Sequence, residues 1–156
     1  MTADQAAARA RAIYLDDAHL HGCAETAFMV LKEAYGLPEP GDSSAAMVLN
    51  GGVAFGGGVC GAITGASLAV GLLEARREPD HATAKRIARE AVAQVMDEFK
   101  EQYGAVDCRS LIGRDIRSPE QHRDFMDSGV WRRTCMSQVE FVVRRLAPRA
   151  RETGKS

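Results

Sequence analysis

The sequence lacks several features that would assign it to a functional class at once. Its 21 acidic and 20 basic residues nearly balance, so the net charge of −1 leaves no basic surplus for binding nucleic acid. Aromatic residues make up only 6% of the chain, and alternating strand patterns are nearly absent. The first twenty residues contain Asp4 and no apolar signal-peptide core, which predicts a cytoplasmic, reducing location.

Charged side chains are also absent between Asp42 and Glu74, a stretch long enough to cross a membrane. The same stretch contains Asn50 and the run Gly56-Gly57-Gly58, however, and a bilayer does not accept the irregular backbone that such a run indicates. We therefore expect buried helices here and no membrane partner.

Apolar side chains recur at helical spacing through most of the chain. They predict helices over about 4–17, 24–35, 43–49, 60–78, 81–103 and 130–147, with Gly36, Gly104 and Pro148 as stop signals. There is no repeat and no linker. The prediction is an all-α protein, a compact bundle of five to six helices. It forms a single domain over residues 1–156, with a Gly-rich break before the fourth helix and a frayed tail at 149–156.

The glycine-rich break surrounds one cysteine, Cys60, in the stretch GGVAFGGGVCGAITGA. Glycine inside regular structure costs about 0.5–1 kcal/mol relative to alanine, so this concentration indicates close backbone approach, positive φ or room for a group that is not a side chain. Gly61, Gly65 and Ala69 recur every four residues. That spacing allows two helix backbones to pack closely, within the molecule or in a homodimer.

The four cysteines, Cys23, Cys60, Cys108 and Cys135, form no CxxC pair, so their spacing alone predicts neither a zinc ribbon nor a thioredoxin-type motif. Three of them, all except Cys108, lie near predicted helix starts, where unpaired N–H groups favour the thiolate. Thiolates attack disulfides, bind metals and hold iron–sulfur clusters. For each cysteine the alternative is a buried thiol that packs as a small hydrophobic side chain.

Two other patterns have weaker support. The sequence GxGxxG at residues 56–61 matches a dinucleotide fingerprint, but no predicted strand precedes it and no second βα unit follows. His19 and His21 alternate with Cys23 and could share a metal with it. We favour a polar helix end with two exposed histidines.

The surroundings of the cysteines resemble the C-GCAxxG-C-C family, which is described as redox-active. The stretches that carry the resemblance are GCAETAF around Cys23, FGGGVCGAITGASLAVGL around Cys60, FKEQYGAVDCRSLIG around Cys108 and CMSQVEFVV from Cys135. The sequence after Cys60 is offset from the literal motif, whereas Gly-Cys-Ala occurs at residues 22–24 with Ala27 in place of the final glycine. We assign the motif to Cys60. A similar region occurs in split-Soret cytochromes, but no CxxCH is present here, so covalent haem is not expected.

The resemblance implies a bound cluster or a redox-active set of thiols. We predict a small electron-transfer protein in which all four cysteines bind a metal cofactor, above all an iron–sulfur cluster. Gly57, Gly58 and Gly61 would supply space and backbone N–H groups. The alternatives are a four-cysteine zinc site, a metal-free thiol–disulfide oxidoreductase with Cys60 as the attacking thiolate, and a helical interaction module with incidental cysteines. The expected partner is a redox protein or a small-molecule electron carrier.

Overall fold

Seven α-helices make up most of the regular structure of residues 1–152, the part of the chain that the computed structural model describes, and these residues contain no β-strand. The helices are α1 (Ala3–Tyr14), α2 (Cys23–Ala34), α3 (Gly61–Arg77), α4 (His81–Tyr103), α5 (Cys108–Ile112), α6 (Pro119–Ser128) and α7 (Met136–Leu146). The regular structure also includes three short helical turns: the 3₁₀ turns η1 (Ser44–Ala46) and η3 (Ala147–Arg151) and the π-helical turn η2 (Trp131–Cys135). The predicted all-α fold is confirmed. The number of helices exceeds five to six because the loop-rich stretch after α4 forms both α5 and α6.

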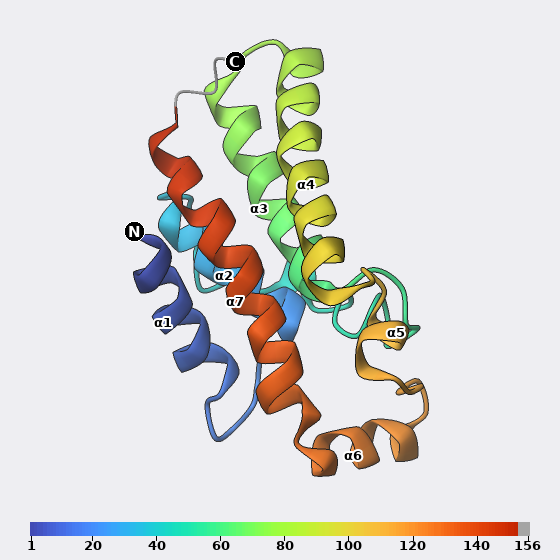
Figure 1. Ribbon diagram of the computed structural model, residues 1–156. Coiled ribbons are helices and arrows are strands. Elements are labelled where there is room, and N and C mark those ends of the chain that lie inside the picture. Colours follow the sequence, from blue (N-terminus) through green and yellow to red (C-terminus); the bar gives the residue numbers. More distant parts are fainter. Residues whose placement is uncertain (153–156) are drawn as a thin grey trace.

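The helix α2 lies at the centre of the bundle. It packs against α1, α3 and α7, and nine of its twelve residues are buried, the charged Glu25 and Lys32 among them. The helices α3 and α4 form a hairpin, while α5 and α6 lie together at one end of the bundle (Figure 1). Among the residues described, no helix combines the length and the apolar composition needed to cross a membrane.

Local signals begin and end the helices largely as the sequence predicts. Asp80 starts α4 by accepting a 3.1 Å hydrogen bond from the Thr83 N–H, and Gly104 ends it in the left-handed region at a φ of 83°. The first helix ends at Tyr14 rather than near residue 17. The carboxylate of Asp16 accepts a hydrogen bond from the Ala18 N–H at 3.2 Å, and this local turn replaces the helical continuation.

The helix expected over 43–49 is only the short turn η1. After it, five consecutive residues, Gly51 to Phe55, have positive φ values between 53° and 76°. A right-handed helix cannot continue through such residues, and the left-handed conformation costs roughly 1–2 kcal/mol for each residue with a side chain. The glycine-rich break is therefore partly a left-handed turn, which we name the Gly51–Phe55 turn.

The small residues of α3 serve the contact with α2. A Cβ atom at Gly65 would collide with the carbonyl oxygen of Ala24, so the two helices can pack this closely only with glycine there. The predicted close approach is confirmed. It is internal, because α2 occupies the face that a homodimer would need.

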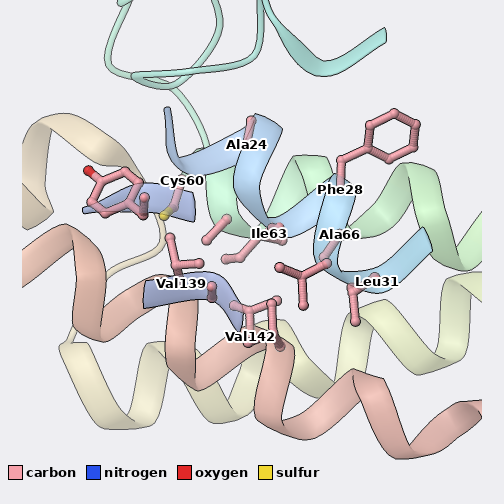
Figure 2. Packing of buried hydrophobic residues seen from close by; sticks show 14 of the residues in the cluster. Ala24, Phe28, Leu31, Cys60, Ile63, Ala66, Val139 and Val142 are labelled. Carbon is pink, nitrogen blue, oxygen red and sulfur yellow. The ribbon is translucent and has the colours of Figure 1, made fainter. Parts of the chain in front are cut away.

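The buried core between α2, α3 and α7 ends at one of the cysteines. Ile63 and Ala66 of α3 pack in the same core as Val139 and Val142 of α7, and Cys60 lies at one end of this cluster (Figure 2). Cys60 is 4% exposed. The predicted inner face of α7 is also confirmed as buried.

The tail expected to fray from residue 149 begins instead with an ordered turn. The Nε atom of Arg149, in η3, donates a 3.0 Å hydrogen bond to Oε1 of Glu74, whose side chain is fully buried. Because a buried carboxylate needs a charged or hydrogen-bonding partner, this pair fixes η3 against α3. Residues 153–156 of the predicted tail lie outside the described residues.

Candidate cysteine site

The structure brings the four cysteines together from four separate segments of the chain. Cys23, Cys108 and Cys135 line one cavity of about 260 Å³. Cys60 is buried beside them, since negative charge on each of the other three raises its pKa. All four are free thiols. The fold therefore brings all four thiols into one neighbourhood of the molecule.

Each cysteine lies at or next to the start of a helical segment. Cys23 and Cys108 are the first residues of α2 and α5, and Cys60 directly precedes α3. Cys108 was expected in a loop, but Asp107 caps α5 by accepting a 2.9 Å hydrogen bond from the Ser110 N–H. Cys135 ends η2, a π-helical turn before α7. Such turns are rare and occur frequently at functional sites.

Two backbone hydrogen bonds align the segments of Cys60 and Cys108. The Cys60 N–H donates to the Val106 carbonyl and the Cys108 N–H donates to the Gly58 carbonyl, both at 2.7 Å. Together they form a single antiparallel bridge between two otherwise irregular segments. The glycine-rich segment thus determines where α5 begins.

Asn50 positions Cys23 by capping α2 from outside the helix. Its Oδ1 accepts a 3.0 Å hydrogen bond from the Ala24 N–H, and its Nδ2 donates to Oε1 of Glu25 at 2.8 Å. Only glycine fits at position 22, because a Cβ atom there would lie 2.5 Å from Oδ1 of Asn50. Asn50 was not identified from the sequence, because a cap usually comes from the residue before the helix and this one lies 26 residues after Ala24.

Backbone N–H groups surround the sulfur of Cys23. Burial raises the pKa of this thiol, and the N–H groups of Gly51, Ala24 and Gly61 offset part of that rise. Gly61 is required at this place, since a Cβ atom there would lie 2.5 Å from the Cys23 sulfur. Gly61 thus makes room for the Cys23 sulfur, while its predicted role toward a cofactor stays a prediction; Gly51, which the sequence did not single out, also lies beside this cysteine.

Gly57 and Gly58 have a different role from the one predicted. Their N–H groups donate to the Gly51 and Gly52 carbonyls at 3.1 and 2.9 Å, and neither glycine lines the cavity. A Cβ atom at Gly57 would lie 3.0 Å from Cβ of Arg109 in α5. Their N–H groups form hydrogen bonds within the glycine-rich segment and are therefore not free to bind a cofactor. Gly57 also lets this segment pack closely against α5.

The Gly51–Phe55 turn forms part of the cavity wall. Its first residue faces Cys23, and the ring of its last residue lies 4.5 Å from the His122 ring, centroid to centroid. The Ala54 N–H holds the turn with a 2.7 Å hydrogen bond to the Val48 carbonyl. Non-glycine residues in this conformation cost about 1–3 kcal/mol each and cluster at functional sites.

Aromatic rings cover the cysteines on the other side. Tyr14 lies close enough to Cys135 for the two side chains to shift each other's pKa, and the Tyr14 ring centroid lies 5.6 Å from that of Trp131. His19 packs on Trp131 at 4.0 Å between ring centroids and lines the cavity. The expectation of two exposed histidines is wrong, because both His19 and His21 are partly buried.

Burial keeps the four thiols protonated. Desolvation raises the pKa of Cys23, Cys60 and Cys135 above the ordinary value and that of Cys108 to about 12. The cysteines also raise one another's pKa, because neighbouring thiolate charges repel. The predicted stabilisation of thiolates at helix starts is thus outweighed by desolvation.

A protein-family model described as "Putative redox-active protein (C_GCAxxG_C_C)" matches residues 21–148. The chain belongs to this family. The resemblance inferred from the cysteine surroundings is confirmed, and the matched region contains all four cysteines and every helix except α1. Comparison with curated proteins and with solved structures found no match.

In this member of the C_GCAxxG_C_C family, α1 completes the site from outside the matched region by supplying Tyr14. Cys23, Cys108 and Cys135 border a space, and Cys60 is buried near them. No group of three or more His, Cys, Asp or Glu side chains within residues 1–152 is arranged to hold a single metal ion.

Proposed function

We propose that Cys23, Cys60, Cys108 and Cys135 bind an iron–sulfur cluster and that the protein transfers electrons through it. The observation that carries this proposal is that three thiols, from three segments, line one cavity and that a fourth, Cys60, is buried near them. Cysteine thiolates are the usual ligands of such clusters, and a bound cluster supplies one-electron transfer. The redox-active description of the family is consistent with this function.

The size of the cavity supports a cofactor of several atoms. A zinc ion needs its four sulfurs at about 2.3 Å from one centre, and no such gathering of ligands occurs in the described part of the chain. The cavity of about 260 Å³ is far larger than the roughly 10–15 Å³ that holds one water molecule. A structural zinc site therefore has less support than a cluster.

The chemistry of the thiols supports a cationic occupant. Burial and mutual repulsion hold a proton on each sulfur of the metal-free protein. A metal displaces these protons and compensates the negative charge of four thiolates in a buried place, so binding releases protons. The N–H groups of Gly51 and Gly61, which lower the pKa of Cys23, would then help to stabilise its thiolate.

Burial counts against the thiol–disulfide alternative in which Cys60 is the attacking thiolate. Cys60 is 4% exposed, and desolvation raises its pKa well above the ordinary value. A nucleophilic cysteine needs both access and thiolate character. An oxidoreductase-type activity, if the protein has one, would then depend on the bound cofactor.

Electrons would enter and leave at the cavity rim. Leu20 lines the cavity and is 72% exposed, so this rim reaches the surface. Phe55 and His122 line the same cavity from the Gly51–Phe55 turn and from α6. A redox protein or a small-molecule carrier that docks there would come close to the cysteines.

Anaerobic reconstitution with ferrous iron and sulfide tests the proposal. We expect a brown protein with visible absorption and with iron and sulfide in stoichiometric amounts. Replacement of any of the four cysteines by serine should lower the retained iron, whereas Met126→Leu, which alters the cavity lining without removing a thiol, should not.

Other outcomes of this experiment would replace the proposal. A colourless protein whose thiol count falls by two on mild oxidation indicates thiol–disulfide chemistry. A colourless protein that retains zinc indicates a structural metal site. A protein with neither metal nor a change in thiol count indicates a helical interaction module.

A further inference from the structure

Gln138 is a buried amide with an unused donor beside Cys60. It lies on α7 and is 3% exposed, and its Oε1 accepts a hydrogen bond from the Cys60 Sγ–H at 3.8 Å. Its Nε2 has no hydrogen-bond partner among the described residues. An unsatisfied buried donor costs roughly 1–3 kcal/mol, so a leucine or methionine would be the more stable choice for a residue with only a packing role.

We propose that Gln138 is a positioning residue that donates an N–H···S hydrogen bond to Cys60 when Cys60 is a metal ligand. This inference rests on the proposed function. A protonated thiol is a donor, so the amide oxygen faces it in the metal-free protein. A ligand thiolate has no proton and can only accept, so the amide nitrogen then becomes the matching group.

The change requires only a rotation of the amide group. The terminal torsion of glutamine is broad and roughly two-fold, so the oxygen and the nitrogen can exchange places without moving the rest of the side chain. After the rotation the Nε2 donor is satisfied and the oxygen is left without a partner. Carbonyl oxygens tolerate this more readily than N–H groups do. The backbone N–H of Ala62 also lies beside this sulfur and lowers its pKa, against the larger rise caused by burial.

Hydrogen bonds to ligand sulfurs stabilise the more negative, reduced state of a cluster and raise its reduction potential. Gln138→Met keeps a similar length and volume but removes the N–H donor. We expect this variant to take up iron and sulfide like the wild type and to have a lower midpoint potential. A tenfold change in the ratio of reduced to oxidised protein corresponds to 59 mV for one electron, and this is the expected size.

Two further measurements separate this effect from a change in packing. Gln94→Met makes the same substitution at an exposed position of α4 and should leave the potential unchanged. Protein labelled with ¹⁵N in the glutamine side chain should show a hyperfine coupling between an amide nitrogen and the reduced cofactor. The coupling should be absent from Gln138→Met.

The possible failures are distinguishable. A wild-type protein that takes up no iron and sulfide overturns the proposed function, and this inference with it. A loaded wild type without the nitrogen coupling, or a loaded Gln138→Met with the wild-type potential, overturns the role of Gln138 and leaves the cluster in place. If Gln138→Met fails to fold, the coupling in the labelled wild type decides the matter.

Discussion

Gly61 lies against the sulfur of Cys23, so close that a Cβ atom on Gly61 would lie 2.5 Å from Sγ. This contact joins the first residue of α3 to the first residue of α2. It explains why a glycine directly follows Cys60. Because Gly61 has no side chain, the N-terminal ends of α2 and α3, each next to a cysteine, can pack against each other. The helix packing and the placement of the thiols therefore depend on the same residue.

Gly61→Ala should separate α3 from α2 at the cysteines. We expect the free energy of unfolding to fall by about 1–3 kcal/mol, as in other overpacked contacts, together with a loss of most of the bound iron. Gly71→Ala is the matched control, because nothing lies within 4 Å of a Cβ atom there. It should raise the stability by about 0.5–1 kcal/mol through better helix propensity. Chemical denaturation and iron analysis measure both effects. Equal stabilities of the two variants would contradict the contact.

Asn50→Ala should remove the cap of α2 and loosen the position of Cys23. The Ala24 N–H loses its acceptor, so we expect the free energy of unfolding to fall by about 0.5–2 kcal/mol and the retained iron to decrease. Ser118→Ala removes the ordinary cap of α6, where Ser118 accepts from the Gln121 N–H at 3.1 Å. It should reduce stability by a similar amount without affecting iron. Iron loss of the same size in both variants would show that stability alone determines retention.

The metal-free protein should lose stability at alkaline pH. Burial raises the pKa of all four thiols, that of Cys108 to about 12, whereas thiols of the unfolded chain titrate near 8.5. The thiol contribution to stability is therefore fully present below about pH 8.5. Above it the unfolded state releases protons that the folded state keeps, and each thiol lowers the free energy of unfolding by about 1.4 kcal/mol per pH unit.

Urea denaturation of iron-free protein between pH 8 and 10 measures this slope. Cys108→Ser removes one titrating thiol and should make the decline shallower. A free energy of unfolding that stays constant over this interval would contradict the burial of the thiols.

The sequence was sufficient for α1 to α4 and α7 and for the list of cysteines, but not for α5, α6 or the short turn that replaces the helix expected over 43–49. Periodicity and stop signals such as Gly104 act over a few residues, so α4 and the inner face of α7 could be predicted directly. Gly61 could be predicted as well, because small residues spaced by four indicate close helix packing. These features depend on neighbours along the chain.

The remaining parts of the site depend on contacts between distant segments. Asn50 caps a helix that begins 27 positions earlier, and Gln138 meets Cys60 across 78 positions. The left-handed conformation of Val53 contradicts its ordinary preference, so no local rule predicts it. The chain also uses the N–H groups of Gly57 and Gly58 within its own loop, which only the folded hydrogen-bond pattern reveals.

The buried pair of Arg149 and Glu74 should contribute strongly to stability at the end of α3 away from the cysteines. Arg149→Ala leaves the fully buried carboxylate of Glu74 with Arg77 as its nearest cation, at 3.6 Å. We expect the free energy of unfolding to fall by about 1–3 kcal/mol, because the buried carboxylate loses its hydrogen-bonded cation while the more distant Arg77 still compensates part of its charge. Arg9→Ala breaks the exposed pair with Glu33 and should cost only about 0–1 kcal/mol. Thermal and urea unfolding compare the two variants, and iron retention at temperatures where both are folded should match the wild type. A small effect of Arg149→Ala would mean that the tail frays from residue 149 after all.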